Sequence, residues 1–266
     1  MRIIKLTIEY DGTHFEGWQV QPKGKRTIQG ELEKTCQKIF HKKIHVFGAG
    51  RTDSGVHALG QVAHFKTDSR LPTEKILLAF NSALPEDISI IEAEDAPKSF
   101  HAQYSAKSKL YRYTILNRRA RTAISRGLYL HYPYPLNVSL MRKEAKTLVG
   151  KKDFKSFQAA DAARLREGKQ RNAIRTIKKL TVRKSGDFIY IDIEADGFLY
   201  KMVRNIVGTL LKIGRKKLPE GTIKAVLAKK KPSFCGTNIK TRRLMFIKSK
   251  LLTAEIEMLY LGSIKT

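Results

Sequence analysis

The order of strand-like and helix-like patterns along the chain constrains its fold more than any other feature of the sequence. Residues 4–10 alternate between apolar and polar side chains, which is typical of a half-buried strand. Further patterns follow in turn: a helix capped by Thr27, strands at 44–50 and 61–67, a helix at about 72–83 and a strand at 88–96. Strands and helices therefore alternate through the first part of the chain.

The second part of the chain repeats this order. It contains a strand pattern at 109–116, a helical pattern at 139–150, a hairpin at 177–197 that turns at Ser185-Gly186-Asp187, and a helical pattern at 202–214. Because hairpins pair their strands antiparallel, we expect an α+β fold with a mainly antiparallel sheet flanked by helices, and not a doubly wound parallel sheet. The seam should lie near 102–108, which divides the chain into residues 1–105 and 106–266.

The charge of the chain indicates its class of partner. The net charge is +28, from 52 lysines and arginines against 24 acidic residues. Such an excess favours a polyanion, with nucleic acid first and an anionic membrane surface second. The alternative is a lysine-rich composition that enriches every surface. Arginines within 118–126 are candidates for phosphate contacts, because the guanidinium fork matches phosphate geometry.

Localisation and metal binding follow from what the sequence contains. The N-terminal residues alternate as in a strand and do not resemble a signal peptide, and we find no apolar run of membrane-spanning length. Cys36 falls on the apolar side of a predicted helix, so we expect it in the core and not in a disulfide with Cys235. The cysteine and histidine spacings do not suggest zinc. We therefore expect a cytoplasmic protein without a bound metal or a membrane partner.

The loop in "GAGRTDSGVHALGQVAHF", residues 48–65, holds one acid, Asp53, among glycines and between two predicted strands. On spacing alone Asp53 is a turn residue, since Asp and Gly are common in turns. However, strands at both ends would fix the loop in the way that catalytic loops are fixed. A carboxylate also repels phosphates, so a surface that only binds RNA would gain nothing from it.

This stretch closely resembles the active-site motif of the TruA family, the tRNA pseudouridine synthases A. Other segments resemble that family in the same order: "YDGTHFEGWQVQP", "KLYRYTI" and "FLYKMVRNIVGTLLKIG". The resemblance covers nearly all of the chain to about Gly214. It implies two similar ferredoxin/RRM-like halves, with the active-site cleft between them.

The resemblance also implies the reaction. A pseudouridine synthase breaks the N-glycosidic bond of a uridine in RNA, rotates the base and rejoins it through C5. No redox change or group transfer occurs, so no small-molecule cofactor is expected, which agrees with a sequence that shows no dinucleotide fingerprint or P-loop. The family acts on the anticodon stem-loop of tRNA, at positions 38, 39 and 40, as a homodimer.

The same resemblance assigns roles to four residues. Asp53 is the catalytic carboxylate, acting as a nucleophile on the sugar or the uracil or as a base at the sugar. Arg204 is the cation that keeps it ionised, and the residue-level alternative for Arg204 is a surface arginine. Tyr111 packs on the target uracil and serves proton transfer, whereas its alternative is a core tyrosine, as expected for Tyr113. Arg51 contacts the backbone beside the extracted nucleotide.

The C-terminal part departs from the family pattern. Gly236-Thr237 is followed by Asn238, and Arg243 stands before Leu244 where the family has glycine. Residues 244–250 still read as a strand, and the tail at 251–266 has no counterpart in the pattern.

Two other functions remain open on the sequence alone. One is a synthase of the same fold that acts on another RNA. The other is a non-catalytic RNA-binding protein or RNA chaperone that has kept the fold. The joint presence of Asp53, Tyr111 and Arg204 favours an enzyme, because a protein that only binds RNA would not need all three.

Overall fold

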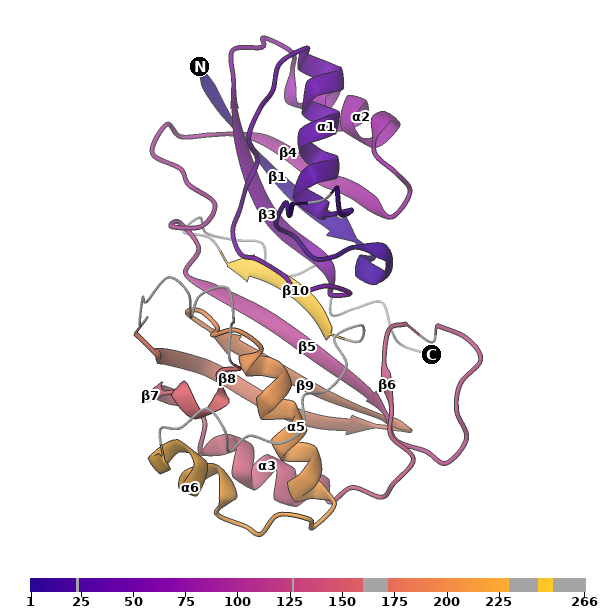
Figure 1. The fold of residues 1–266 in the computed structure, drawn as a ribbon, viewed down its shortest axis with the longest axis vertical. Coiled ribbons are helices and arrows are strands. Elements are labelled where there is room, and N and C mark those ends of the chain that lie inside the picture. Colours follow the sequence, from indigo (N-terminus) through magenta and orange to yellow (C-terminus); the bar gives the residue numbers. More distant parts are fainter. Residues whose placement is uncertain (23, 126, 160–171, 230–243, 251–266) are drawn as a thin grey trace.

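A computed structural model describes residues 1–22, 24–125, 127–159, 172–229 and 244–250 (Figure 1). The strands are β1 (Arg2–Tyr10), β2 (Phe47–Gly48), β3 (His57–Thr67), β4 (Ile88–Ala96), β5 (Ser108–Leu116), β6 (Leu130–His131), β7 (Gly150–Asp153), β8 (Ile174–Ser185), β9 (Phe188–Ala195) and β10 (Leu244–Lys250). The helices are α1 (Ile28–Phe40), α2 (Thr73–Ala83), α3 (Val138–Lys146), α5 (Met202–Gly214) and α6 (Thr222–Lys229), with 3-10 turns η1 (Gly12–His14) and η2 (Lys155–Phe157).

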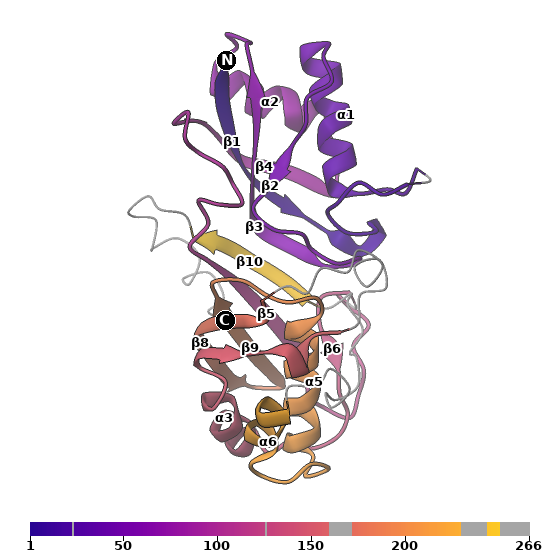
Figure 2. The same ribbon diagram turned by 60° about the vertical axis from the view of Figure 1, so that its left-hand side comes forward.

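All the strands join one ten-stranded sheet. Its main path runs β4-β1-β3-β10-β5-β9-β8-β7, while β2 pairs with β3 and β6 pairs with β5. The pairings are antiparallel except β3 with β10 and β5 with β6. The expected α+β fold with a largely antiparallel sheet is therefore confirmed. Figures 1 and 2 show β10 in the middle of the sheet, between the parts of the chain before and after residue 105.

Local sequence features explain the first elements. Ile4, Leu6 and Ile8 of β1 are fully buried, as the alternating pattern predicts. Thr27 caps α1, because its side chain accepts a hydrogen bond from the backbone N–H of Gly30. The thiol of Cys36 on α1 is free and fully buried, so its placement in the core is confirmed.

The later elements also follow the sequence pattern. The hairpin forms from β8 and β9, with Ser185 paired to Phe188 across a two-residue turn. Helix α5 begins at Met202 and ends at Gly214, as predicted, and all of its residues except Lys212 are buried. This helix thus packs on nearly every side, which its apolar composition requires.

The predicted strand at 44–50 is wrong in its extent, since only Phe47–Gly48 pairs with the sheet. Side chains of α1 bind the preceding backbone instead: Val46 donates its N–H to Glu33, and its carbonyl accepts from Gln29. The N–H and carbonyl groups of Val46 are thus already satisfied and are not available to a strand partner. The next strand, β3, begins at His57, four residues before its predicted start.

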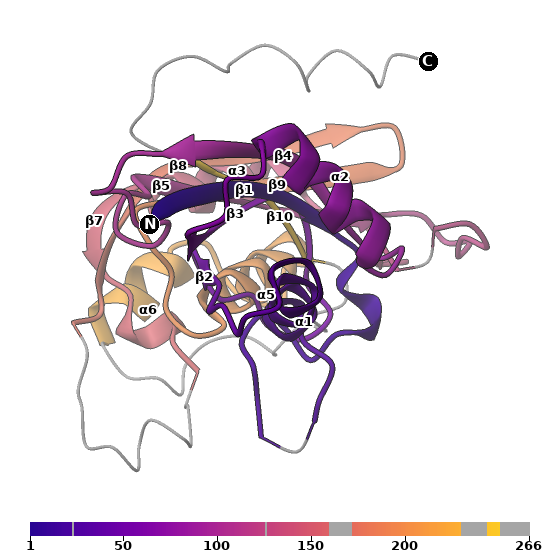
Figure 3. The ribbon, with the colours of Figure 1, turned by 90° about the horizontal axis from the view of Figure 1, so that it is seen from above.

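Helices α1 and α5 lie on the same side of the sheet (Figure 3). No helix among the described residues combines the length and apolar character that a membrane span requires. The C-terminal strand is present as β10, whereas Cys235, 236–243 and the tail at 251–266 lie outside the described residues.

Candidate active-site cleft

A cleft of about 510 Å³ opens where residues from 1–105 and from 106–266 meet. Its lining includes Arg51, Asp53, Tyr111 and Arg204, so the structure brings together all four predicted site residues. The first two come from the loop between β2 and β3, Tyr111 comes from β5, and Arg204 comes from the first turn of α5. Residues far apart in the sequence thus converge on one cavity.

Hydrogen bonds hold the Asp53 loop from both sides. The hydroxyl groups of Thr52 and Tyr10 lie 2.8 Å apart, and the Thr52 carbonyl accepts the Trp18 N–H at 3.0 Å. On the other side, Gln61 of β3 donates to the Gly50 carbonyl at 2.9 Å. These contacts fix the backbone on either side of Asp53, as a preorganised site requires.

The segment after β1 packs its backbone directly on this loop. Ser54 donates its hydroxyl and Gly55 its N–H to the Phe15 carbonyl, both at 3.2 Å. Gly17 has a φ of +97°, and a Cβ there would lie 2.6 Å from the Thr52 carbonyl oxygen. Only glycine permits that approach. The "DGTHFEGW" stretch therefore serves as the support of the Asp53 loop.

Arg204 is buried, with 7% of its surface exposed. Burial lowers the pKa of its guanidinium, and the negative charge of Asp53 acts in the opposite direction. The alternative of a surface arginine is therefore wrong. A guanidinium remains cationic at neutral pH, so Arg204 places a positive charge beside the carboxylate.

Tyr111 stands in the wall of the cleft on β5. Its ring makes edge-to-face contacts with Phe198 and Phe246, at centroid distances of 5.1 and 5.0 Å. Burial raises the pKa of the Tyr111 hydroxyl, and Tyr10 and Asp53 raise it further. Tyr111 therefore keeps its proton at neutral pH. Tyr113 is fully buried and does not line the cleft, which confirms its placement in the core.

The charges around the cleft are strongly asymmetric. Asp53 is the one carboxylate in the described lining, which also holds the side chains of Arg51, Lys109, Arg175, Lys201 and Arg204. Arg51 is exposed, unlike Arg204. The first turns of α1 and α5 also contribute lining residues. A polyanion is attracted to such a cleft, and the charge of Asp53 is stabilised inside it.

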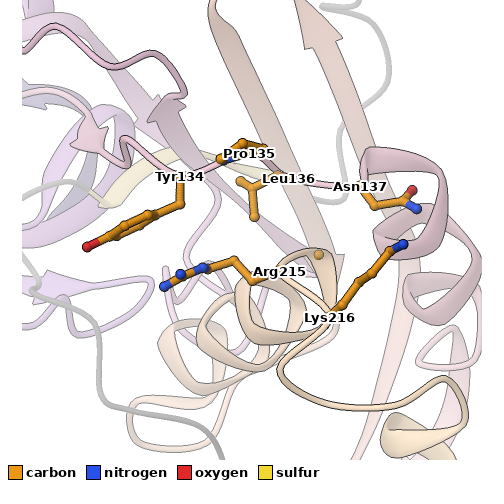
Figure 4. Close-up of a pocket in the computed structure, with 7 residues that line it drawn as sticks. Tyr134, Pro135, Leu136, Asn137, Arg215 and Lys216 are labelled. Carbon is orange, nitrogen blue, oxygen red and sulfur yellow. The ribbon is translucent and has the colours of Figure 1, made fainter.

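A second cavity of about 510 Å³ lies at the C-terminal end of α5 (Figure 4). It is lined by Tyr134, Pro135, Leu136, Asn137, Gly214, Arg215 and Lys216. The Arg215 guanidinium lies 3.8 Å from the centre of the Tyr134 ring. The described lining of this cavity contains no carboxylate, in contrast to the first cleft.

The sequence reasoning missed Lys109 and Arg175 as lining residues. A signal for Lys109 was available, because Lys109 and Tyr111 are two residues apart in a strand and share one face. Arg175 carries no such signal, since it comes from β8, two strands away from β5. In the parts of the chain that the structure describes, no cluster of three or more His, Cys, Asp or Glu side chains is arranged to hold a metal ion.

Comparisons with known proteins give a consistent result. A family described as tRNA pseudouridine synthase matches residues 6–105 and 145–250 of this chain. A tRNA pseudouridine synthase A from Thermoanaerobacter sp. (strain X514) is 44% identical over 248 residues, 93% of this chain and 99% of the relative. A tRNA pseudouridine synthase A 2 from Clostridium perfringens is 45% identical, covering 88% and 95%. A tRNA pseudouridine synthase A from Halalkalibacterium halodurans is 41% identical, covering 97% and 95%.

Proposed function

Because the chain belongs to the tRNA pseudouridine synthase family, we propose that it isomerises uridine to pseudouridine in the anticodon stem-loop of tRNA, at positions 38, 39 and 40. The family match extends to residue 250, beyond the end of the resemblance at Gly214, and so includes β10. The observation that carries the proposal is one cleft in which Asp53, the one carboxylate of the described lining, lies among cations with Tyr111 and Arg204.

Asp53 acts as the catalytic carboxylate in this proposal. It either attacks the sugar or the uracil, or removes a proton from the sugar, and each of these roles needs the ionised form. Desolvation by a bound base would favour the protonated form, and the positive charge of Arg204 opposes that shift. Arg204 thereby keeps the carboxylate reactive in a cleft from which water is displaced.

Tyr111 serves the base. The ring offers an apolar surface against which a uracil can pack, and its hydroxyl carries a proton at neutral pH. The isomerisation breaks the bond from C1′ to N1 and forms one from C1′ to C5. N1 gains a proton and C5 loses one, so the reaction is balanced without a cofactor. The Tyr111 hydroxyl is the group assigned to this proton transfer.

Arg51 has a different task. A uridine in a stem must leave its stack to reach Asp53, which costs about a few kcal/mol. Arg51 is exposed in the lining of the cleft, where it can contact the backbone of an extruded nucleotide. Contacts between cations and phosphates offset the cost of extrusion and recognise the shape of the RNA more than its sequence.

The architecture proposed for this function is a pair of ferredoxin-like halves, residues 1–105 and 106–266. The strand order supports it. The sheet runs β4-β1-β3-β2 in the first half and β10-β5-β9-β8 in the second, which places corresponding strands in corresponding positions. The cleft lies between these halves, because both of them contribute lining residues.

Two further parts of the proposal concern the whole protein in the cell. The enzyme is cytoplasmic, with its tRNA substrate, and the free buried thiol of Cys36 is consistent with a reducing compartment. It is a homodimer, as the family resemblance implies. Light scattering of the purified protein measures the mass: a dimer is expected, and a monomer at micromolar concentration contradicts this part.

One experiment tests the activity. The purified protein is incubated with unmodified tRNA, and pseudouridine is mapped along the product. New pseudouridine at positions 38 to 40, in tRNAs that carry uridine there, is the expected result. Pseudouridine only in other RNAs of a total RNA sample supports the synthase with a different substrate. No pseudouridine in any RNA, despite tight binding, supports the non-catalytic RNA-binding protein.

A further inference from the structure

Lys109 and Arg175 form part of one wall of the cleft. Lys109 lies on β5 opposite Ala195 of β9, and Ala195 lies opposite Ile177 of β8. Arg175 is two residues from Ile177 on β8 and shares its face. The two cations therefore lie on the same sheet surface, on the two strands that flank β9, and their side chains are long enough to approach each other.

Among the residues that the structure describes, neither cation is paired with an acid. Arg175 donates from Nη1 to the carbonyl oxygens of Asn172 and Ile174, at 2.8 and 2.6 Å. Within the described ranges, neither Lys109 nor Arg175 has a salt bridge. Arg112, on β5 with Lys109, does have an acidic partner, since it binds Asp192 with two hydrogen bonds of 2.7 and 2.8 Å.

The position of Lys109 is also confined. A Cβ on Gly50 would lie 2.9 Å from the Lys109 ammonium nitrogen, so a glycine in the Asp53 loop leaves room for this side chain. Burial lowers the pKa of Lys109, and the charge of Arg175 lowers it further. Two like charges in a partly desolvated cleft raise the free energy of the empty protein, and an anion between them reverses that effect.

We infer that Lys109 and Arg175 together bind one backbone phosphate of the RNA, next to the nucleotide held over Asp53. This inference rests on the proposed function, since RNA must enter the cleft. The guanidinium fork and the ammonium group are the donors that suit a phosphodiester. Lys109 shares a strand face with Tyr111, about 7 Å away along the strand, so the phosphate belongs to the target nucleotide or to its immediate neighbour.

The first test measures RNA binding as a function of salt. A labelled anticodon stem-loop is titrated with the parent, Lys109→Met, Arg175→Met and the double variant, with Lys184→Met as a control on an exposed lysine of β8 outside the cleft. Each single change should lower the affinity about 5- to 20-fold at low salt. It should also flatten the slope of log affinity against log salt by about 0.7 to 0.9, the loss of one phosphate contact. The double variant should lose less than the product of the two single effects.

The second test identifies the phosphate. Single phosphates around the target uridine are replaced by uncharged methylphosphonates, one position at a time. At one position, the replacement should weaken binding by the parent and leave the affinity of Lys109→Met unchanged. If every position weakens both proteins equally, the inference is overturned. Inorganic phosphate is added in a separate arm at constant ionic strength. Competition by inorganic phosphate, when no methylphosphonate position has an effect that depends on Lys109, indicates a free-anion site and also overturns the inference.

Two controls test whether the variants are folded and whether charge is the cause of their effect. Thermal melts check that each is folded, and Lys109→Arg, which keeps the charge, should retain the slope of the parent. If Lys109→Met is unfolded, the salt slopes of Arg175→Met and Lys109→Arg test the inference in its place. A slope equal to that of Lys184→Met in a folded Lys109→Met or Arg175→Met protein overturns the inference. Binding is measured without turnover. A protein that binds RNA in this way but makes no pseudouridine would therefore contradict the proposed function and leave the inference about the phosphate intact.

Discussion

At the scale of single residues, the cleft depends on one charged pair. The Asp53 carboxylate and the Arg204 guanidinium interact across the interface between 1–105 and 106–266. A buried charge without a partner is strongly unfavourable, and the negative charge of the half-buried Asp53 offsets part of the cost of burying Arg204. The pair also explains why a basic RNA-binding surface tolerates an acid at its centre.

Removal of Arg204 tests this pair. In Arg204→Ala the carboxylate loses the neighbouring cation that favours its ionised form, so the acidic limb of the pH–rate profile should move to higher pH. Arg204→Lys should recover part of the rate, because a bidentate fork becomes a point charge. Arg215→Ala, at the other end of α5, is the control. A profile for Arg204→Ala that superimposes on that of the parent contradicts the pair.

At the scale of elements, the Asp53 loop is positioned by neighbours on β1, on β3 and in the segment after β1. The Tyr10–Thr52 hydrogen bond is the buried link in this set, with 3% and 6% of the two residues exposed. The loop thus depends on the sheet beneath it for its geometry.

Tyr10→Phe measures the importance of this support. It leaves the Thr52 hydroxyl without its tyrosine partner and should cost about 1 to 2 kcal/mol of the free energy of unfolding. Because the loop becomes less constrained, the single-turnover rate of pseudouridine formation should fall more than the affinity for tRNA. Tyr104→Phe, at a tyrosine that is 80% exposed, is the matched control. An unchanged single-turnover rate in Tyr10→Phe would show that the hydrogen bond does not position Asp53.

A second element-scale feature is the aromatic cluster between β2, β3 and the segment after β4. His64 stacks on Phe47 at 5.1 Å and contacts the His101 ring at 4.7 Å, and its Nδ1 accepts the Ala102 N–H at 3.2 Å. Burial lowers the pKa of His64 to about 4, with further lowering from His101 and Lys66. The folded protein therefore holds His64 neutral.

This cluster predicts a loss of stability in mild acid. The pKa of His64 is lower in the folded protein than in the unfolded chain, so its contribution is complete above about pH 6.5 and is lost as the pH falls towards 4. The free energy of unfolding should fall by about 2 kcal/mol from this residue between pH 7 and pH 5. His64→Asn keeps an acceptor for the Ala102 N–H and should remove that part of the pH dependence. Urea unfolding at both pH values makes the comparison, and equal losses in parent and variant would contradict it.

An element could be predicted from the sequence where the contacts that form it join residues close together in the chain. Thr27 marks the start of α1 through a hydrogen bond to Gly30, three residues away, and the apolar pattern at 202–214 lies within one segment, so α1 and α5 were predicted well. The strand at 44–50 was not, because the bonds from Val46 to Glu33 and Gln29 depend on how α1 packs. Met202, Val203, Ile206 and Val207 surround Arg204 in the sequence and are a local signal of its burial, whereas Arg175 reaches the cleft only through the strand order.

At the scale of the whole molecule, β10 joins the sheet into one body. It pairs in parallel with β3 and antiparallel with β5, and Phe246 contacts Tyr111 in the cleft wall. The strand that follows the departure from the family pattern is thus directly involved in the geometry of the site. The positive charge of the cleft is also a property of the whole molecule, because its cations come from both parts of the chain.

The salt dependence of tRNA binding reports this charge. Arg51, Lys201 and the Lys109–Arg175 pair predict about three phosphate contacts, and hence a slope of log affinity against log salt near −2.5. Affinity should then fall about 30-fold between 50 and 200 mM salt. An unstructured RNA of equal length should compete less well than the stem-loop. A nearly flat dependence contradicts the polyanion-binding cleft.

Replacement of Asp53 by asparagine tests the central claim most directly. Asp53→Asn keeps the shape of the side chain and removes its charge and nucleophilicity, so pseudouridine formation should vanish while tRNA binding persists. Asp187→Asn is the matched control, because Asp187 stands in the β8–β9 turn outside the cleft, and it should leave the rate unchanged. Pseudouridine formation is measured in both variants beside the parent, with thermal melts to establish that each is folded. Loss of activity in Asp53→Asn alone is the predicted result. A folded Asp53→Asn protein that forms pseudouridine at a rate near that of the parent would contradict the account.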